Sequence, residues 1–239
     1  MSRNKDAMSG TLYLVPNLLG VAPPHDVLPE RTIATARRLM HWAVETPKAA
    51  RAFLKAVGVD KPIAELEVWA LAEAAGVEAA LAALAQGRDV GLLSDAGCPA
   101  VADPGSALIA QAHQRDIRVV PLVGPSAVLL ALMASGMNGQ HFCFHGYLPV
   151  KPDARAGALW RLEEQSRARR RTEVWIETPY RNVALLRSLG ATLAANTRVC
   201  VAADLTLATE TIECTTAAQW RKRDPGRFDK RPAIFLLQA

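Results

Sequence analysis

The stretch from Val90 to Gly136 constrains the fold more than any other part of this chain. It holds two short apolar runs, 90–94 and 117–123, and each ends in a Gly- and Pro-containing loop before a segment with helical spacing begins. Apolar runs of this length between such loops are typical of strands buried on both faces of a parallel sheet. The stretch therefore predicts a strand–helix–strand–helix unit, and we expect an α/β protein.

The loops that follow these two strands, Asp95–Gly105 and Gly124–Ala127, are expected to lie side by side. Both strands end at the carboxyl edge of the sheet, where folds of this kind bind their ligands. The first loop contributes two carboxylates, Asp95 and Asp103, and the second opens a helix whose first N–H groups lack partners within the helix. Gly, Pro and Asp are also ordinary turn residues, but two such loops after adjacent strands indicate a binding site.

Three glycines in these loops are expected to have backbone roles. Gly97, Gly105 and Gly124 allow the main chain to take a positive φ or to approach a ligand closely. We therefore expect a site whose walls are partly main chain.

The pattern SDAGxPxxxDPG, followed by a strand and then GPSA, resembles the tetrapyrrole methylase superfamily. It is most similar to the branch that methylates a ribose 2′-hydroxyl in small-subunit ribosomal RNA. The matching segments are 94–99, 103–105 and 124–127. The resemblance covers nearly the whole chain and implies two α/β domains, S-adenosylmethionine in the cleft between them, and a homodimer.

The expected domain boundary follows the apolar helix that ends at Gly136. Asn138 and Gly139 form a turn, and 141–148 alternates aromatic residues like a strand of a new sheet. We expect a disordered tail at 1–9, an N-terminal α/β domain at 10–138 and a C-terminal α/β domain at 139–239.

The resemblance also implies which residues hold S-adenosylmethionine. Carboxylates and carbonyl oxygens of the 95–105 loop suit the positive sulfonium, and small residues such as Ala127 and Ala233 suit the adenine and amino-acid parts. The cofactor-binding residues expected on this basis are Leu19, Asp95, Ala96, Gly97, Cys98, Val101, Asp103, Ser126, Ala127, Glu177, Thr178, Ala203, Pro232 and Ala233.

Segment 44–51 aligns without gaps with the branch's A-E-D-T-R-x-x-R. Glu45 and Arg51 are retained, Lys48 replaces an arginine, and Thr46 replaces the aspartate. Glu45 is the predicted catalytic residue, assisting loss of a proton from the acceptor hydroxyl, and Lys48 and Arg51 are predicted substrate contacts. The same residues equally fit a helix N-terminus that Glu45 and Thr46 cap.

Two further substrate contacts are expected from the second half of the chain. The branch has paired lysines where Lys151 is followed here by Pro152, and its E-A-P-H-R resembles 177–181. By this analogy Glu177 and Arg181 face the cleft, although by themselves they equally fit a surface ion pair. The first loop departs from the branch, with Leu18 in place of a proline and Val21 in place of an asparagine.

A net charge of +5 is mild, but the basic residues cluster. One group comprises Arg167 and Arg169–Arg171, and a second lies within 221–231. Either group would suit phosphate contacts or a solvated surface. The four cysteines have no paired spacing, so we expect neither a zinc site nor a disulfide framework, and we interpret the scattered histidines as structural.

Three functions are open at this level: an RNA 2′-O-methyltransferase, a tetrapyrrole C-methyltransferase, and a non-catalytic binding module on a methylase fold. Ribosomal RNA or the small ribosomal subunit is the expected partner of the first. No apolar run approaches the length of a membrane span, and residues 1–10 lack the apolar core of a signal peptide. We therefore expect a cytoplasmic protein that does not associate with membranes.

Overall fold

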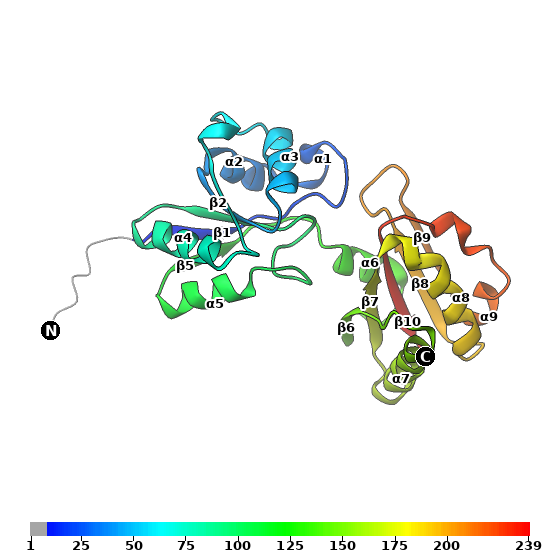
Figure 1. Ribbon diagram of the computed structural model, residues 1–239. Coiled ribbons are helices and arrows are strands. Elements are labelled where there is room, and N and C mark those ends of the chain that lie inside the picture. Colours follow the sequence, from blue (N-terminus) through cyan, green and yellow to red (C-terminus); the bar gives the residue numbers. More distant parts are fainter. Residues whose placement is uncertain (1–8) are drawn as a thin grey trace. The chain divides into compact units, whose positions relative to one another are not determined.

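The computed structural model describes residues 9–239, which divide into two compact units between Ser126 and Ala127. Each unit has a five-stranded sheet of its own (Figure 1). The predicted pair of α/β domains is therefore present. The tail predicted at 1–9 lies, apart from Ser9, outside the described residues.

The first unit has a parallel sheet with strand order β3-β2-β4-β1-β5. Its elements are β1 (Thr11–Leu14), α1 (Pro24–Val27), α2 (Glu30–Arg38), β2 (His41–Val44), α3 (Pro47–Val57), the 3₁₀ turn Ile63–Glu65, β3 (Glu67–Ala70), α4 (Ala74–Ala85), β4 (Val90–Leu93), α5 (Ser106–Gln114) and β5 (Arg118–Pro121).

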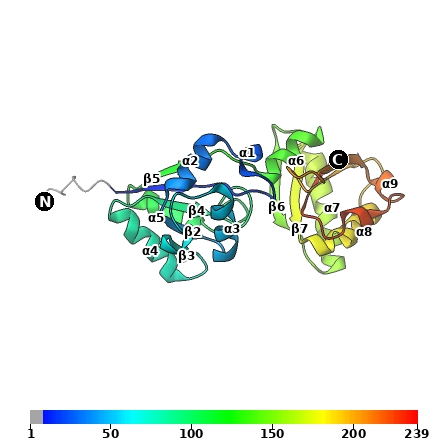
Figure 2. The same cartoon turned by 90° about the horizontal axis from the view of Figure 1, so that it is seen from above.

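Helices cover both faces of this sheet. Helices α2 and α3 pack on one face around Trp42 and Leu54, and α4 and α5 pack on the other around Leu84 and Leu108 (Figures 1 and 2). All four residues of β4 are buried. The uninterrupted apolar runs of the sequence follow from burial on both faces.

The first unit differs from the expected strand arrangement in one respect. We predicted that the strands before the two glycine-containing loops are adjacent, but β1 lies between β4 and β5 and pairs with both. The chain leaves β1, forms β2 and β3, and returns to place β4 beside β1. As a result, the loop after β1 takes part in the same edge of the sheet.

The second unit has a mixed sheet with strand order β6-β7-β10-β8-β9, in which β6 and β7 are parallel and the other pairs antiparallel. Its elements are α6 (Ala127–Ser135), β6 (Phe142–Tyr147), α7 (Pro152–Arg169), β7 (Thr172–Glu177), the 3₁₀ turn Pro179–Arg181, α8 (Asn182–Thr192), β8 (Arg198–Ala203), β9 (Thr211–Thr216), α9 (Ala217–Trp220), the 3₁₀ turn Pro225–Phe228 and β10 (Ala233–Gln238).

Helix α6 belongs to this second unit, so the division falls earlier than the boundary expected at 138–139. It packs against β10, β9 and β8, and α7, α8 and α9 belong to the core on the opposite face of that sheet. Arg198 of β8 donates to the carbonyl oxygens of Ser135 and Gly136, at 3.4 and 3.2 Å. These contacts fix the end of α6 on the second sheet.

Two element ends are well defined. The segment before β3 is a 3₁₀ turn at Ile63–Glu65, and β3 begins only at Glu67. Helix α7 begins at Pro152. Proline fits the first helical position because it has no N–H to satisfy and its φ is already helical.

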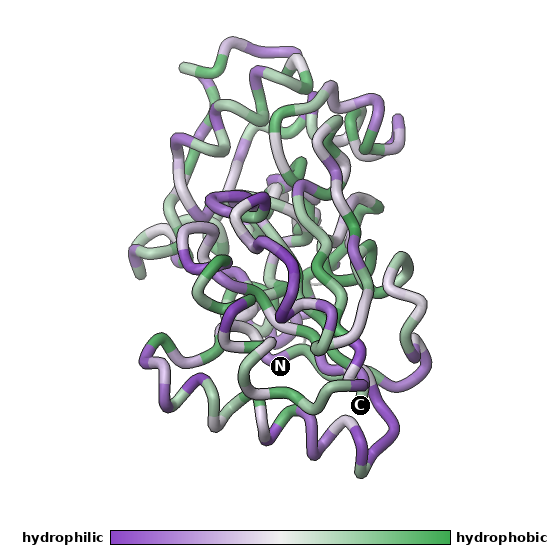
Figure 3. The backbone as a smooth tube through the Cα atoms, turned by 90° about the vertical axis from the view of Figure 1, so that its right-hand side faces the viewer, coloured by the Kyte–Doolittle hydropathy of each residue, from purple (hydrophilic) through white to green (hydrophobic). Residues whose placement is uncertain are grey.

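Hydrophilic and hydrophobic stretches intermingle along the backbone (Figure 3). In α3 the buried residues Ala50, Phe53, Leu54 and Val57 recur at helical spacing, as expected for a helix with one face on a sheet. No helix in residues 9–239 is both long and apolar enough to cross a membrane.

The packing of β2 against β4 yields a test of the first core. A Cβ at Gly91 would lie 2.6 Å from two ring carbons of the fully buried Trp42. We expect Gly91→Ala to destabilise the protein by about 1–3 kcal/mol, because the indole has no room to move. The midpoint of urea unfolding, followed by circular dichroism, measures this loss.

Gly139→Ala is the matched control, since a Cβ there would meet nothing within 4 Å. Equal midpoints for the two variants would contradict the packing described for Trp42.

Candidate functional site

Three loops meet at the carboxyl edge of the first sheet: 15–20 after β1, Asp95–Gly105 after β4, and 122–126 after β5. Asn17, which is buried, joins the first two. Its N–H donates to the Gly97 carbonyl at 2.9 Å, and its Nδ2 donates to the carbonyls of Ser94 and Asp95, both at 3.0 Å. The predicted proximity of the two glycine-containing loops is confirmed by the Cys98 Sγ, which donates to the Pro125 carbonyl at 3.4 Å.

Asn17 was missed as a site residue by the sequence analysis. The available signal was an asparagine directly after a buried strand in a Pro- and Gly-containing segment, where its side chain can replace backbone hydrogen-bond partners.

The 95–105 loop has an unusual backbone. Gly97 and Gly105 have φ of 66° and 132°, as their sequence positions suggested, but Ala100 and Ala102 also lie in the left-handed region, at 64° and 67°. Residues with a Cβ rarely adopt this conformation, and such strain concentrates at functional sites. The third predicted glycine, Gly124, serves a close approach, since a Cβ there would lie 2.4 Å from Pro16 Cβ.

Carboxylates fasten this loop to helix α3. The Asp95 N–H donates to Glu45 Oε2 at 2.9 Å, and Asp95 Oδ1 accepts from the Thr46 N–H at 3.2 Å and from its hydroxyl at 2.8 Å. Thr46 is the N-cap of α3, its hydroxyl accepting from the Ala49 N–H. Glu45, the predicted catalytic residue, therefore holds the loop and does not cap the helix.

Asp103 completes an acidic cluster with Glu45 and Asp95. Burial raises the pKa of the Asp103 carboxyl to about 6, and the negative charges of Glu45 and Asp95 act in the same direction, with the Ser94 hydroxyl opposing them weakly. The cluster thus concentrates negative charge, and a positive group would relieve the repulsion.

A cavity of about 310 Å³ adjoins this cluster in the first unit. The predicted residues Leu19, Asp95 and Ala96 line it, together with Phe53 and the small face of α3 that carries Ala49, Ala52 and Ala56. The predicted substrate contacts Lys48 and Arg51 are exposed on the same helix. A larger hollow of about 490 Å³ in the second unit is lined by the charged residues Glu213, Arg223, Asp224 and Arg227.

The remaining predicted cofactor residues of these loops differ in their exposure to solvent. Burial raises the pKa of the Cys98 thiol, so it stays protonated. Val101 is 48% exposed. Ser126 ends the first unit and Ala127 begins α6, and both are half-buried.

The predicted cofactor residues of the second unit form one row across its sheet. Ala233 is the register partner of both Glu177 and Ala203, and Thr178 and Pro232 directly adjoin this row. The Glu177 carboxylate is buried and its Oε2 has no hydrogen-bond partner among the described residues.

The two predicted substrate contacts of the second unit differ in whether their charge is free to meet a substrate. Arg181 is bound to Glu177, with Nε at 2.7 Å and Nη2 at 2.5 Å from Oε1. The two side chains form an ion pair that is mostly buried, which differs from the surface ion pair that the sequence also allowed. Lys151 is exposed at the N-terminus of α7.

Most arginines of the two basic groups are bound to other groups of the fold. They are therefore not available for the phosphate contacts that the sequence allowed. Arg171 is buried and its Nε lies 2.6 Å from Glu173 Oε1. In the second group Arg223 and Arg227 both pair with Glu213, and Arg231 pairs with Asp204 at 2.8 Å. Arg221 donates to the carbonyls of Gly190 and Leu193. These arginines are occupied within the fold, unlike the exposed Arg169 and Arg170.

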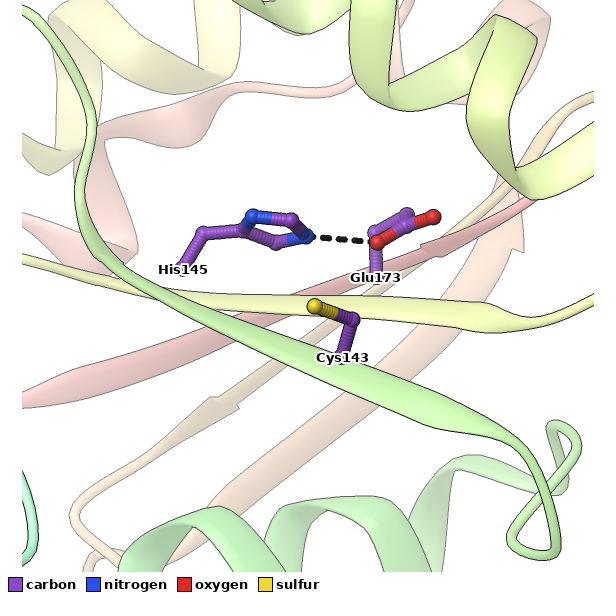
Figure 4. A group of neighbouring side chains, drawn as sticks. All are labelled: Cys143, His145 and Glu173. Atoms are coloured by element: carbon purple, nitrogen blue, oxygen red, sulfur yellow. Dashed lines mark hydrogen bonds and ion pairs between the residues drawn. The ribbon is translucent and has the colours of Figure 1, made fainter.

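One group in residues 9–239 has donor atoms that could hold a metal ion: Cys143 and His145 of β6 and Glu173 of β7, all within 4.8 Å of one another (Figure 4). The Glu173 carboxylate is already bound by Arg171 and, at 2.5 Å, by His145 Nε2. Burial alone would raise the pKa of Glu173, but these two hydrogen bonds outweigh it and lower the pKa. A metal would have to displace the His145 contact next to an arginine, so we interpret the group as a structural network.

Comparison with known proteins gives consistent results. Residues 30–220 match the family described as Tetrapyrrole (Corrin/Porphyrin) Methylases. Ribosomal RNA small subunit methyltransferase I of Pasteurella multocida is 33% identical, over 96% of this chain and 79% of that protein. The protein of the same name from Haemophilus influenzae is 32% identical, over 92% of this chain and 76% of that protein.

Solved structures share the fold. The methyltransferase CobJ superposes with a TM-score of 0.62 at 21% identity, over 96% of this chain and 94% of that chain. Cobalt precorrin-4 methyltransferase CbiF gives a TM-score of 0.62 at 14% identity, over 95% and 94% of the two chains.

The raised pKa of Asp103 predicts a pH dependence of stability. Between its unfolded value, 3.8, and about 6 the folded protein binds more protons at Asp103 than the unfolded chain, so its contribution to the unfolding free energy falls as pH rises through this window. Asp103→Asn removes this decline. We expect the variant to match the wild type near pH 4 and to exceed it by about 1 kcal/mol above pH 6, a figure reduced for the group's partial exposure.

Urea unfolding at a series of pH values measures this difference. Asp60→Asn, at an exposed position remote from the cluster in sequence, is the control for the loss of one carboxyl. A difference between wild type and Asp103→Asn that is constant with pH would show that the cluster is not repulsive.

Proposed function

The chain belongs to the tetrapyrrole methylase family, and we propose that it transfers a methyl group from S-adenosylmethionine to ribosomal RNA, with a ribose 2′-hydroxyl as the acceptor. The observation that carries this proposal is the 33% identity, over nearly the whole chain, to a relative named for methylation of small-subunit ribosomal RNA. The matches to the 2′-O-methylating branch in 94–99 and 44–51 support the choice of acceptor.

The residues present fit S-adenosylmethionine. The acidic cluster suits a positive sulfonium, and the strained 95–105 backbone and the adjoining apolar cavity suit a ligand held partly by main chain. In the second unit the orphaned Glu177 Oε2 is a buried acceptor that a ligand N–H would satisfy. We assign cofactor contacts to Leu19, Asp95, Ala96, Gly97, Asp103 and Ala127, and to the row of Glu177, Ala203 and Ala233.

Bound S-adenosylmethionine supplies an electrophilic methyl group on sulfur. Methyl transfer is an in-line displacement, so the chain's main contribution is to hold the hydroxyl oxygen, the methyl carbon and the sulfur in line. Asn17, Glu45 and Thr46 support this task because they fix the 95–105 loop by side-chain hydrogen bonds. Asp95 and Asp103 stabilise positive charge at the site.

The acceptor hydroxyl must lose its proton during transfer. Glu45 Oε2 already accepts from the Asp95 N–H, so the other oxygen of Glu45 is the freer one to take this proton. Asp103, with its pKa raised to about 6, is well matched to accept a proton near neutral pH. We therefore retain Glu45 as a candidate and add Asp103.

RNA binding requires cations free to meet phosphates. Lys48 and Arg51 meet this requirement in the first unit, since both are exposed on α3 beside the residues that line the cavity. Lys151 is the corresponding candidate in the second unit, whereas Arg181 is engaged by Glu177 and Arg171 by Glu173.

The cofactor assignment is tested at the start of α6. Ala127→Leu places a large side chain in its first turn, so we expect the affinity for S-adenosylmethionine and S-adenosylhomocysteine to fall at least tenfold. That corresponds to about 1.4 kcal/mol of binding free energy. Isothermal titration calorimetry measures both ligands.

Ala134→Leu, at an exposed position of the same helix, is the matched control and should bind as the wild type does. Normal binding by Ala127→Leu, or no binding of either ligand by the wild type at millimolar concentration, would refute the assignment.

The RNA assignment is tested by the double variant Lys48→Gln/Arg51→Gln. Loss of two phosphate contacts should weaken binding to small-subunit ribosomal RNA and reduce the slope of log affinity against log salt by about 1.4–1.8. Transfer of labelled methyl to the RNA should fall with it, while cofactor affinity stays unchanged.

Arg31→Gln/Lys61→Gln removes the same charge from exposed positions away from the cavity and controls for net charge. Equal effects of both double variants, or methyl transfer to a porphyrinogen and not to RNA, would overturn the RNA assignment. Absence of transfer to either acceptor despite cofactor binding would favour a non-catalytic module.

A further inference from the structure

Two cysteines outside the proposed site face each other on neighbouring strands of the second sheet. Cys200 of β8 and Cys214 of β9 are direct register partners in an antiparallel pair. Opposed residues of such a pair project to the same face, with Cα atoms about 4.5 or 5.5 Å apart. Both spacings lie within the range of roughly 4.4–6.8 Å that a disulfide bridges. Both thiols are free in the structure.

The two thiols differ in their access to solvent. Cys200 is fully buried, whereas Cys214 is exposed on β9, which forms an edge of the sheet. A dissolved oxidant therefore reaches Cys214 first, and Cys200 lies behind it as the next sulfur available.

Arg198 places a positive charge beside this pair. Its Nη2 lies 3.7 Å from the Cys214 Sγ. The hydrogen bond that the Cys200 thiol donates lowers the pKa of Cys214 to about 6; burial opposes this shift and Arg198 reinforces it. The same interaction raises the pKa of Cys200. The attacking thiolate is thus on the exposed residue.

Among the described residues of β8, β9, β10 and α6, no other charged side chain accompanies Arg198 on this face. The residues that flank Cys214 on the same face of β9 are Ile212 and Thr216, and the partner of Cys200 on β10 is Leu236. Helix α6, which packs over this face, has no titratable side chain. Arg198 is therefore the charged group, among the described residues of these elements, that faces the two sulfurs.

We propose that Cys200 and Cys214 form a redox-active dithiol, in which Cys214 is attacked first and Cys200 closes a reversible disulfide. With hydrogen peroxide, the Cys214 thiolate attacks one oxygen, gives a sulfenic acid and releases water after protonation. The Cys200 sulfur then attacks the sulfenic sulfur, forms the S–S bond and releases a second water. With a low-molecular-weight disulfide, the Cys214 thiolate attacks one sulfur, breaks the S–S bond, releases the first thiol and forms a mixed disulfide. The Cys200 sulfur then attacks Cys214, closes the protein S–S bond and releases the second thiol.

Formation of the bond ties the edge strand β9 to β8. It also removes the thiolate from Arg198, which holds the end of α6 through the carbonyls of Ser135 and Gly136. The dithiol is independent of the methyl acceptor and of the cofactor, so its test stands apart from the proposed function.

The test uses the full chain treated with hydrogen peroxide or with oxidised glutathione. After alkylation and proteolysis without reduction, mass spectrometry should find one cross-linked pair of peptides, joining Cys200 to Cys214, and reduction should separate them. The Cys98→Ser/Cys143→Ser variant should give the same pair. In Cys200→Ser the reaction should stop at Cys214, as a sulfenic acid trapped by dimedone or as a stable glutathione adduct.

Alkylation rates test the activation by Arg198. In the wild type at pH 6, Cys214 should react with iodoacetamide about tenfold faster than an ordinary thiol, since its larger thiolate fraction outweighs its lower intrinsic nucleophilicity. Cys98, whose pKa is raised by burial, is the slow internal control. Arg198→Gln should move the pH of half-maximal rate upward, and Arg198→Lys should restore part of the shift.

Three results would overturn the proposal. One is a stable adduct on Cys214 in the wild type with no cross-link to Cys200. Another is a cross-link that joins Cys98 or Cys143 instead. The third is a Cys214 alkylation profile that matches that of Cys98 and does not respond to Arg198→Gln.

Discussion

The position of β1 between β4 and β5 is the constraint on which the proposed site depends. Because β1 pairs with both strands, three loops end at one edge of the sheet, and Asn17 can bond to the backbone of the 95–105 loop. Those hydrogen bonds, with the one that Glu45 accepts from Asp95, hold a backbone that includes two alanines at positive φ. The strain of the loop is thus compensated by contacts from the loop after β1 and from the segment between β2 and α3.

Electrostatic repulsion is the second feature of this edge. Three carboxylates, Glu45, Asp95 and Asp103, are gathered there, and the burial of Asp103 together with the charges of the other two raises the pKa of Asp103. A fold that keeps such a cluster stores unfavourable energy, which a bound cation releases. The proposed sulfonium ligand has the required charge, and the cavity beside the cluster has the apolar lining that the rest of such a ligand needs.

The positive charge of the two basic groups, in contrast to the clustered carboxylates, is mostly bound within the fold. Most arginines of the two basic groups are held by carboxylates or carbonyl oxygens of their own fold, as Arg171 and Arg231 illustrate. The cations that remain free near the cavity, Lys48 and Arg51, belong to no cluster in the sequence. Arg198 is also engaged within the fold: it donates to a carbonyl oxygen at the end of α6 and lies beside Cys214. The pairing of Cys214 with Cys200 follows from the strand register.

The sequence by itself determined the fold class, the strand–helix–strand–helix unit from Val90 to Gly136, and the two loops of the binding edge. It did so because burial on both faces of a sheet demands apolar runs, and because sharp loops demand glycine at positions such as Gly97 and Gly105. Strand order, the membership of α6, the bonds of Asn17 and the pairing of Cys200 with Cys214 were decided only by the tertiary structure. Each depends on which segments, distant in the sequence, pack together in space, and the residue pattern of a single segment does not specify its distant neighbours.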